Sequence, residues 1–118
     1  MNTFYEQVYD TVMQIPYGCV VSYGDIAKWL LRPRGAQVVG WAMGALRGKD
    51  VGKYENIPWH RVVKADGSIV CHDITEMRRA MLAEEGVEFD LDGRVDMERF
   101  RWFAPPGIDR RYGGGNLQ

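Results

Sequence analysis

The side chains that could do chemistry gather in one short stretch near the middle of the chain, Ile57-Pro58-Trp59-His60-Arg61-Val62-Val63. The residue before His60 is a tryptophan, whose indole is no strong nucleophile but offers a flat apolar wall and an N–H donor. The two cysteines, Cys19 and Cys71, belong to no Cys-x-x-Cys pair or Cys/His cluster, so neither a structural zinc nor a disulfide is indicated. These residues therefore indicate no metal site and no cofactor.

Length and composition bound the kind of protein. A chain of 118 residues with 46% hydrophobic and 26% charged residues is typical of one soluble globular domain. No apolar run is long enough to span a bilayer, and the N-terminus lacks a signal-peptide pattern. We expect a monomer in the cytoplasm, or in the nucleus of a eukaryote, with a domain over 1–104 and a disordered tail over 105–118.

Charge is distributed unevenly although the formal net charge is only −1. Residues 28–64 hold eight lysines and arginines against two acids, whereas residues 66–98 hold ten acids against three arginines. Salt screens charges that lie more than about 10 Å apart, so a local basic patch can bind phosphates in a nearly neutral protein. The basic loop that includes Arg47 is a candidate phosphate contact, while a solvated charged surface is the alternative.

The elements that must position these residues begin with three helices. Thr3 and Glu6 form a capping signature for a first helix that ends near Ile15-Pro16. Ser22 can cap a short second helix that runs to Leu30, and Pro33 stops it. A third helix places one apolar stripe on the core, formed by Val39, Ala42, Met43 and Leu46. Two short helices joined by a glycine-containing turn are typical of a helix-turn-helix.

The second half of the sequence predicts short β-strands on both sides of a further helix. Asp66-Gly67 favours a hairpin between Val62-Val63 and Ile69-Val70, and a helix should follow from Asp73 to Gly86. Alternation over 87–91 and 95–97 predicts a second hairpin. The aromatic residues expected to seal it to the body are Phe100, Trp102 and Phe103. The predicted fold is mostly α with small β hairpins, a winged helix-turn-helix-like domain.

The central stretch also resembles a known signature. Pro58-Trp59-His60-Arg61-Val62 is similar to the Pro-Cys-His-Arg-Val motif of the O6-alkylguanine-DNA alkyltransferases, with tryptophan in place of the reactive cysteine. Further matches follow in the family's order, at Ile15-Pro16-Tyr17-Gly18, Val21-Ser22-Tyr23-Gly24, residues 36–43, Asp66-Gly67 and Glu84-Glu85-Gly86-Val87. The resemblance covers almost the whole chain except the tail, and it identifies the chain as a member of the alkyltransferase-like group.

The resemblance implies a lesion-binding pocket without an attacking group. His60 and Glu85 match the residues that activate the family's cysteine, so here they are expected to remain as a hydrogen-bond network that holds the turn. Trp59 would form a wall for a guanine rotated out of the helix. The other expected pocket residues are Tyr23, Met43, Pro58, Val62, Ile69, His72 and Asp73.

The resemblance also implies that the third helix enters the minor groove, where Ala36 and Gly40 allow close backbone approach. Gln37 stands where the family usually has an arginine that fills the vacated base stack, and Arg34 or Trp41 could take over that task. The expected partner is double-stranded DNA containing O6-alkylguanine. The expected function is non-enzymatic recognition of this lesion and its direction to nucleotide excision repair proteins.

Two other functions are weighed against this one. An active alkyltransferase could use Cys71, beside His72, as a displaced nucleophile, although no second histidine and glutamate pair is placed to activate it. A DNA-binding regulator could use the same helix-turn-helix without any preference for lesions. The retained Tyr23 and pocket motif argue against that regulator.

Overall fold

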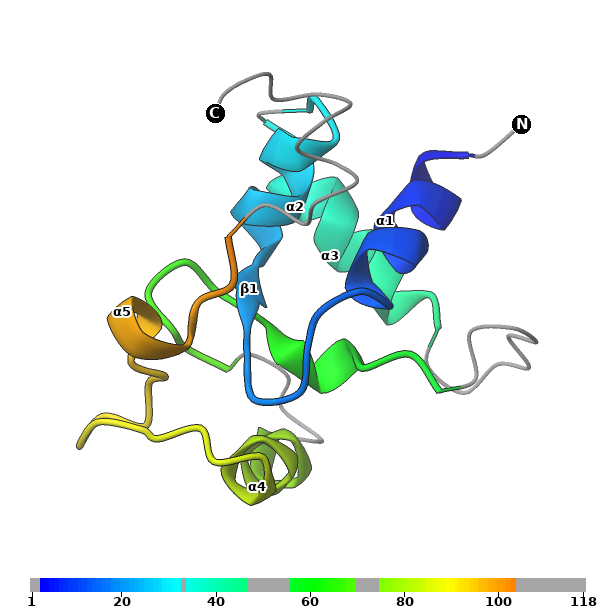
Figure 1. Ribbon diagram of the computed structural model, residues 1–118. Coiled ribbons are helices and arrows are strands. Elements are labelled where there is room, and N and C mark those ends of the chain that lie inside the picture. Colours follow the sequence, from blue (N-terminus) through cyan, green and yellow to red (C-terminus); the bar gives the residue numbers. More distant parts are fainter. Residues whose placement is uncertain (1–2, 33, 47–55, 70–74, 104–118) are drawn as a thin grey trace.

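The computed structural model describes residues 3–32, 34–46, 56–69 and 75–103. Three helices, α1 (Phe4–Val12), α2 (Tyr23–Trp29) and α3 (Ala36–Gly44), pack against one another. A short parallel pair, β1 (Val21–Ser22) and β2 (Val62–Val63), links them to the second half of the chain, where α4 (Thr75–Glu84) lies apart from the three-helix group (Figure 1). The remaining elements are a 3₁₀ turn, η2 (Trp59–Arg61), and α5 (Met97–Phe100).

Local signals set the start of α1 and its length. The Thr3 side chain accepts from the Glu6 N–H, and the Glu6 side chain accepts from the Thr3 N–H, which completes the predicted capping box. The helix ends at Val12, three residues earlier than expected, because the backbone tightens into i→i+3 bonds before Pro16. Inside the core, the Tyr9 hydroxyl donates to the Ala42 carbonyl at 2.6 Å and so ties α1 to α3.

The helix pair α2 and α3 forms as predicted. Ser22 caps α2 with a second capping box, in which Asp25 is the N3 residue. Leu31, with a φ of 63°, reverses the chain after α2, and the Arg32 N–H donates to the Ala27 carbonyl at 2.8 Å. Residues Val39, Ala42 and Met43 of α3 are buried, whereas Gln37 and Trp41 are exposed. The opposite face of α3 is therefore available for binding.

The strand pairing differs from the prediction. Val62–Val63 pairs in parallel with Val21–Ser22, and no strand includes Ile69 within the described part of the chain, so the predicted hairpin between 62–63 and 69–70 was wrong. Val21, Val62 and Val63 are fully buried, which suits a central parallel pair covered on both faces rather than a surface hairpin. The turn itself is present, because the Lys64 N–H donates to the Ser68 carbonyl and Gly67 has a φ of 88°.

A second, smaller core joins α4 to the C-terminal part of the described chain. Its buried residues are Val20, Val63, Leu82, Val87 and Val95. The predicted hairpin here is reduced to one antiparallel bridge between Phe89 and Val95, since Met97 begins α5 instead of continuing a strand. The turn between them has Gly93 at a φ of 80°. The segment that contains Gly93 and Val95 lies against the 64–68 turn, where the Val95 N–H donates to the Gly67 carbonyl at 2.9 Å.

The three aromatic residues at the end of α5 and just after it differ in their burial. Phe100 packs against the second core, and the Trp102 ring meets the Trp29 ring edge-on with centroids 6.0 Å apart. Phe103, in contrast, is 68% exposed, so the expectation that it seals the body was wrong. The Phe103 ring packs against the Arg101 guanidinium instead of the core, and this guanidinium also binds the buried Asp25 carboxylate. The predicted helix start at Asp73 and the predicted tail lie outside the described residues.

We expect Gly67→Ala to destabilise the protein by at least about 2 kcal/mol, through an unfavourable positive φ and a steric clash. A Cβ at this position would lie 2.3 Å from the Val95 carbonyl oxygen. The matched control is Gly40→Ala, because a Cβ at this position would meet nothing within 4 Å. This substitution should stabilise α3 by up to about 1 kcal/mol. Urea unfolding midpoints measure both changes, and an unchanged midpoint for Gly67→Ala would contradict this view of the turn.

Candidate nucleic-acid interface

Trp59 lies on η2, between Pro58 and the buried strand β2. The Trp59 N–H donates to the Ile57 carbonyl at 2.8 Å, and the Arg61 N–H donates to the Pro58 carbonyl at 3.0 Å, so the backbone on both sides of the indole is fixed. The indole is half-buried against the first core, the larger cluster of buried residues that includes Val8, Ile26 and Val39. It meets the His60 ring edge-on, with centroids 6.1 Å apart. Trp59 is therefore a rigid part of the surface rather than a core residue.

Arg78 of α4 covers one side of this indole. Its guanidinium carbon lies 5.4 Å from the ring centroid, and Nη2 donates to the carbonyls of Trp59 and Val62 at 3.0 and 2.8 Å. The side chain is buried, and its Nε has no hydrogen-bond partner among the described residues. A ligand can therefore contact only the other face or the edge of the indole. Sequence reasoning missed Arg78, although its position four residues before Leu82 places both on one face of α4.

The predicted association of His60 and Glu85 is present. His60 Nε2 lies 2.7 Å from Glu85 Oε2. The carboxylate also accepts from Arg61 Nη2 at 2.8 Å and from the Gly18 N–H at 2.8 Å, two partners that the sequence did not predict. Arg61 Nη1 then donates to the Ile15 carbonyl at 2.8 Å. This Glu85 network joins η2, the turn after α1 and the end of α4.

Both titratable members of the network have shifted pKa values. Burial raises the pKa of Glu85, but hydrogen bonds from Arg61 and His60 outweigh it and lower the pKa to about 2. Burial lowers the pKa of His60 in spite of its hydrogen bond to Glu85. His60 is therefore neutral at pH 7, and Nε2 donates to the carboxylate. Its Nδ1 is buried and has no hydrogen-bond partner among the described residues, so the site holds an unpartnered base next to Trp59 in the sequence.

A hollow of about 480 Å³ lies at the carboxyl ends of β1 and β2, and Trp59, which precedes β2, is not among its lining residues. Its lining residues come from α2, α3 and the turn after β2, and they are Tyr23, Gly24, Ala36, Gln37, Gly40, Lys64 and Ala65. The structure thus brings together four of the predicted site residues, three of them from α3. Lys64 could not be predicted to line this hollow, because its place here depends on the parallel strand pairing.

The other predicted site residues lie elsewhere. Met43 and Val62 are buried in the first core, Pro58 is half-buried, and Ile69 packs against the second core. Arg34 and Trp41 are exposed but do not line the hollow. The remaining predicted residues, Arg47, His72 and Asp73, lie outside the described residues.

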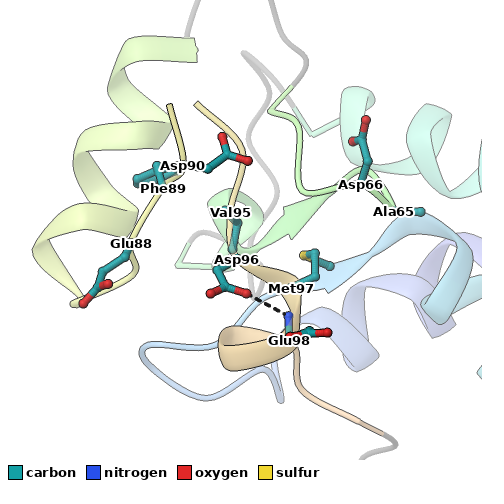
Figure 2. A pocket seen from close by; sticks show the side chains of 9 residues that line it. All are labelled: Ala65, Asp66, Glu88, Phe89, Asp90, Val95, Asp96, Met97 and Glu98. Carbon is teal, nitrogen blue, oxygen red and sulfur yellow. Dashed lines mark hydrogen bonds between the residues drawn. The ribbon is translucent and has the colours of Figure 1, made fainter. Parts of the chain in front are cut away.

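A second hollow, of about 390 Å³, shares Ala65 with the first and is strongly acidic. Figure 2 shows carboxylates around a floor that contains Phe89, Val95 and Met97. The acidic lining residues are Asp66, Glu88, Asp90, Asp96 and Glu98. Within the described ranges no group of three or more such side chains is placed to hold a metal ion, and no helix is long and apolar enough to span a membrane. This side of the molecule repels phosphates, which leaves the α3 side for a nucleic acid.

The helix pair, the covered parallel strands and the hollow at their ends define a mostly helical DNA-binding domain of the helix-turn-helix type. A family model described as the DNA binding domain of 6-O-methylguanine DNA methyltransferase matches residues 3–87. The chain therefore belongs to this family.

Relatives and solved structures agree with this assignment. A DNA base-flipping protein of Escherichia coli is 40% identical over 103 residues, which cover 86% of this chain and 75% of that protein. Alkyltransferase-like protein 1 of Schizosaccharomyces pombe is 42% identical over 91 residues, which cover 75% of this chain and 80% of that protein.

Two solved structures show the same fold. The S. pombe Atl1 structure in complex with damaged DNA containing O6-carboxymethylguanine has a TM-score of 0.71 and 35% identity, covering 88% of this chain and 100% of that chain. The Mycobacterium tuberculosis OGT structure in complex with DNA has a TM-score of 0.59 and 31% identity, covering 72% of this chain and 50% of that chain. The chain thus resembles alkyltransferase-like proteins over most of their length.

We expect Glu85→Gln to lower stability by about 2–3 kcal/mol at pH 7, since each unit of pKa depression is worth about 1.4 kcal/mol. The depressed pKa of Glu85 stabilises the fold fully above the ordinary value of 4.5, and this stabilisation disappears as the pH falls from 4.5 towards 2. The difference between variant and wild type should therefore shrink by roughly half or more at pH 3.

Urea unfolding at pH 7 and pH 3 measures this dependence. The matched control is Glu84→Gln, which changes an exposed carboxylate one residue away and should alter stability by less than about 0.5 kcal/mol. An equal loss for Glu85→Gln at both pH values would show that the charge of the carboxylate does not stabilise the network.

Proposed function

We propose that this protein recognises O6-alkylguanine in double-stranded DNA without repairing it, by rotating the damaged nucleotide out of the helix and against Trp59. The observation that carries the proposal is the position of this indole. It directly precedes His60 in a turn where the His60–Glu85 pair is intact. In the resembling signature a cysteine precedes the histidine, so the supporting residues remain here while the attacking sulfur is absent from that position.

The chemistry of the site supports binding in place of transfer. Alkyl transfer to the protein needs a thiolate in line with the alkyl carbon and a base that can take its proton. Neutral His60 could serve as such a base, but the indole beside it has no comparable nucleophile. An aromatic wall held by fixed backbone bonds can instead stack on an extruded base.

The exposed face of α3 supports minor-groove binding. A Cβ at Gly40 or Gly44 would meet nothing within 4 Å, so this side of the helix is open to a close-lying backbone. No acidic residue occurs in the first turn of α3 to repel phosphates. Proteins that bend DNA from the minor groove use such close approach to compensate for the cost of unstacking. We propose that α3 enters the minor groove with Gln37 and Trp41 towards the DNA.

The relatives support the same function. One is named for base flipping, and the S. pombe protein was solved with DNA that contains an O6-alkylated guanine. We propose further that the bound complex marks the lesion for nucleotide excision repair and that the protein acts as a monomer wherever the DNA lies, in the cytoplasm or the nucleus. The retained Tyr23 and the retained pocket motif around Trp59 favour lesion recognition over a regulator without lesion preference. Cys71, the nucleophile of the enzymatic alternative, lies outside the described residues.

We expect the purified protein to bind an O6-methylguanine duplex more tightly than the unmodified duplex and to accept no methyl group. Fluorescence anisotropy gives the two affinities, and intact-protein mass spectrometry after incubation detects transfer. Equal affinities would remove the lesion preference, and a gain of one methyl in mass would show that the protein is an enzyme.

We expect Trp59→Ala to weaken binding to the lesion duplex by about 5- to 150-fold, because base stacking on an aromatic side chain is worth roughly 1–3 kcal/mol. Binding to undamaged DNA should change much less. Trp59→Phe, which keeps an aromatic wall, should retain most of the lesion preference. Trp41→Ala is the matched control, since it removes an exposed tryptophan of α3 and should alter both affinities together. An unchanged ratio of affinities in Trp59→Ala would exclude the indole from lesion recognition.

A further inference from the structure

The α3 side of the hollow between α2, α3 and the 64–65 turn carries no positive charge, because its lining residues there are Ala36, Gln37 and Gly40. A rotated nucleotide brings its backbone phosphates towards the protein, and a cation within hydrogen-bond distance stabilises such a phosphate. Position 37 on α3 faces the hollow but carries a neutral glutamine. The amide of Gln37 can form hydrogen bonds, but it supplies no positive charge. Another lining residue has to supply it.

Among the described residues that line the hollow, Lys64 is the one with a charged side chain. Arg34 and Trp41, the substitutes suggested by sequence, are exposed at other places on the surface. The exposed Lys64 lies opposite α3 and on the same hollow as Gln37. A lysine therefore faces the position at which a charge is missing.

The parallel pairing fixes where Lys64 lies. Ser22 is the register partner of Val63, so the next residues on the two strands, Tyr23 and Lys64, leave the pair side by side at its carboxyl end. Two backbone bonds then hold the start of the turn, from the Lys64 N–H to the Ser68 carbonyl at 3.0 Å and from the Gly67 N–H to the Lys64 carbonyl at 2.8 Å. The lysine thus extends from a fixed backbone position next to Tyr23.

The nearest acid in sequence faces the other hollow. Asp66 accepts from the Ser68 N–H at 2.9 Å and lies 3.7 Å from Arg94 Nε. It lines the acidic hollow, whereas Ala65 lines both hollows. Lys64 and Asp66 of this turn thus line different hollows.

We propose that Lys64 binds a backbone phosphate of the rotated nucleotide and thereby supplies the positive charge that Gln37 lacks. This inference rests on the proposed function. It predicts that Lys64 and position 37 act as alternatives: a charge at one makes a charge at the other less valuable.

The test measures affinity for an O6-methylguanine duplex and for its unmodified counterpart over a range of salt concentrations. Lys64→Ala should weaken lesion binding roughly tenfold or more and reduce the slope of log K against log salt by about one. The loss should be larger on lesion DNA than on undamaged DNA, and 2-aminopurine fluorescence beside the lesion should report less unstacking. Lys64→Arg should retain the affinity.

Arg94→Ala is the matched control because it removes the same charge from the opposite side of the same turn. It should leave the salt slope unchanged. Adding Gln37→Arg should strengthen lesion binding more in the Lys64→Ala background than in the wild type.

The outcomes separate the inference from the function on which it rests. A wild type without lesion preference would overturn the proposed function. With lesion preference intact, an unchanged slope in Lys64→Ala, or a loss equal to that of Arg94→Ala, would overturn the inference alone. An equal loss on both duplexes would also overturn it, because Lys64 would then bind a phosphate outside the rotated nucleotide.

Discussion

The buried carboxylate of Glu85 is the group on which the arrangement of the site depends. A carboxylate that leaves water is tolerated only when its oxygens are fully hydrogen-bonded, and here the donors come from His60, Arg61 and Gly18. Two of these donors lie on η2 and the third lies in the turn after α1. The Glu85 carboxylate therefore holds η2, this turn and the end of α4 in one arrangement. Trp59 directly precedes His60 of this network, and Arg78 binds the Trp59 carbonyl and lies over the indole ring.

Those parts of the fold that depend on neighbouring residues could be predicted from the sequence. The Thr3–Glu6 capping box, the Ser22 cap and the apolar stripe of α3 all follow from contacts within one or two helical turns. The strand pairing could not be predicted in the same way. Val62-Val63 next to an Asp-Gly turn is typical of a hairpin, and only the burial of these valines in the folded protein makes a parallel partner 41 positions earlier preferable.

The same division applies to the site. The run Pro58-Trp59-His60 identifies this turn as a candidate site in the sequence. The resemblance predicts that His60 pairs with Glu85, and the structure contains this pair. Arg78 and Lys64 could not be found in that way, because an arginine in a charged helix and a lysine in a turn are usually solvated. Each gains its place from a non-local contact: α4 against η2 for Arg78, and β1 beside β2 for Lys64.

The 64–66 turn has a consequence for the molecule as a whole. Since Lys64 lines one hollow and five carboxylates line the other, charge is unevenly distributed around this turn while the net charge stays near zero. Such a distribution exerts little pull on a polyanion at long range, but it exerts a torque once the two are within a Debye length. The protein would rotate before it makes contact, presenting α3 and turning its carboxylates away. Near-neutrality and correct orientation are thus compatible, and the search along undamaged DNA need not be slowed by tight non-specific attachment.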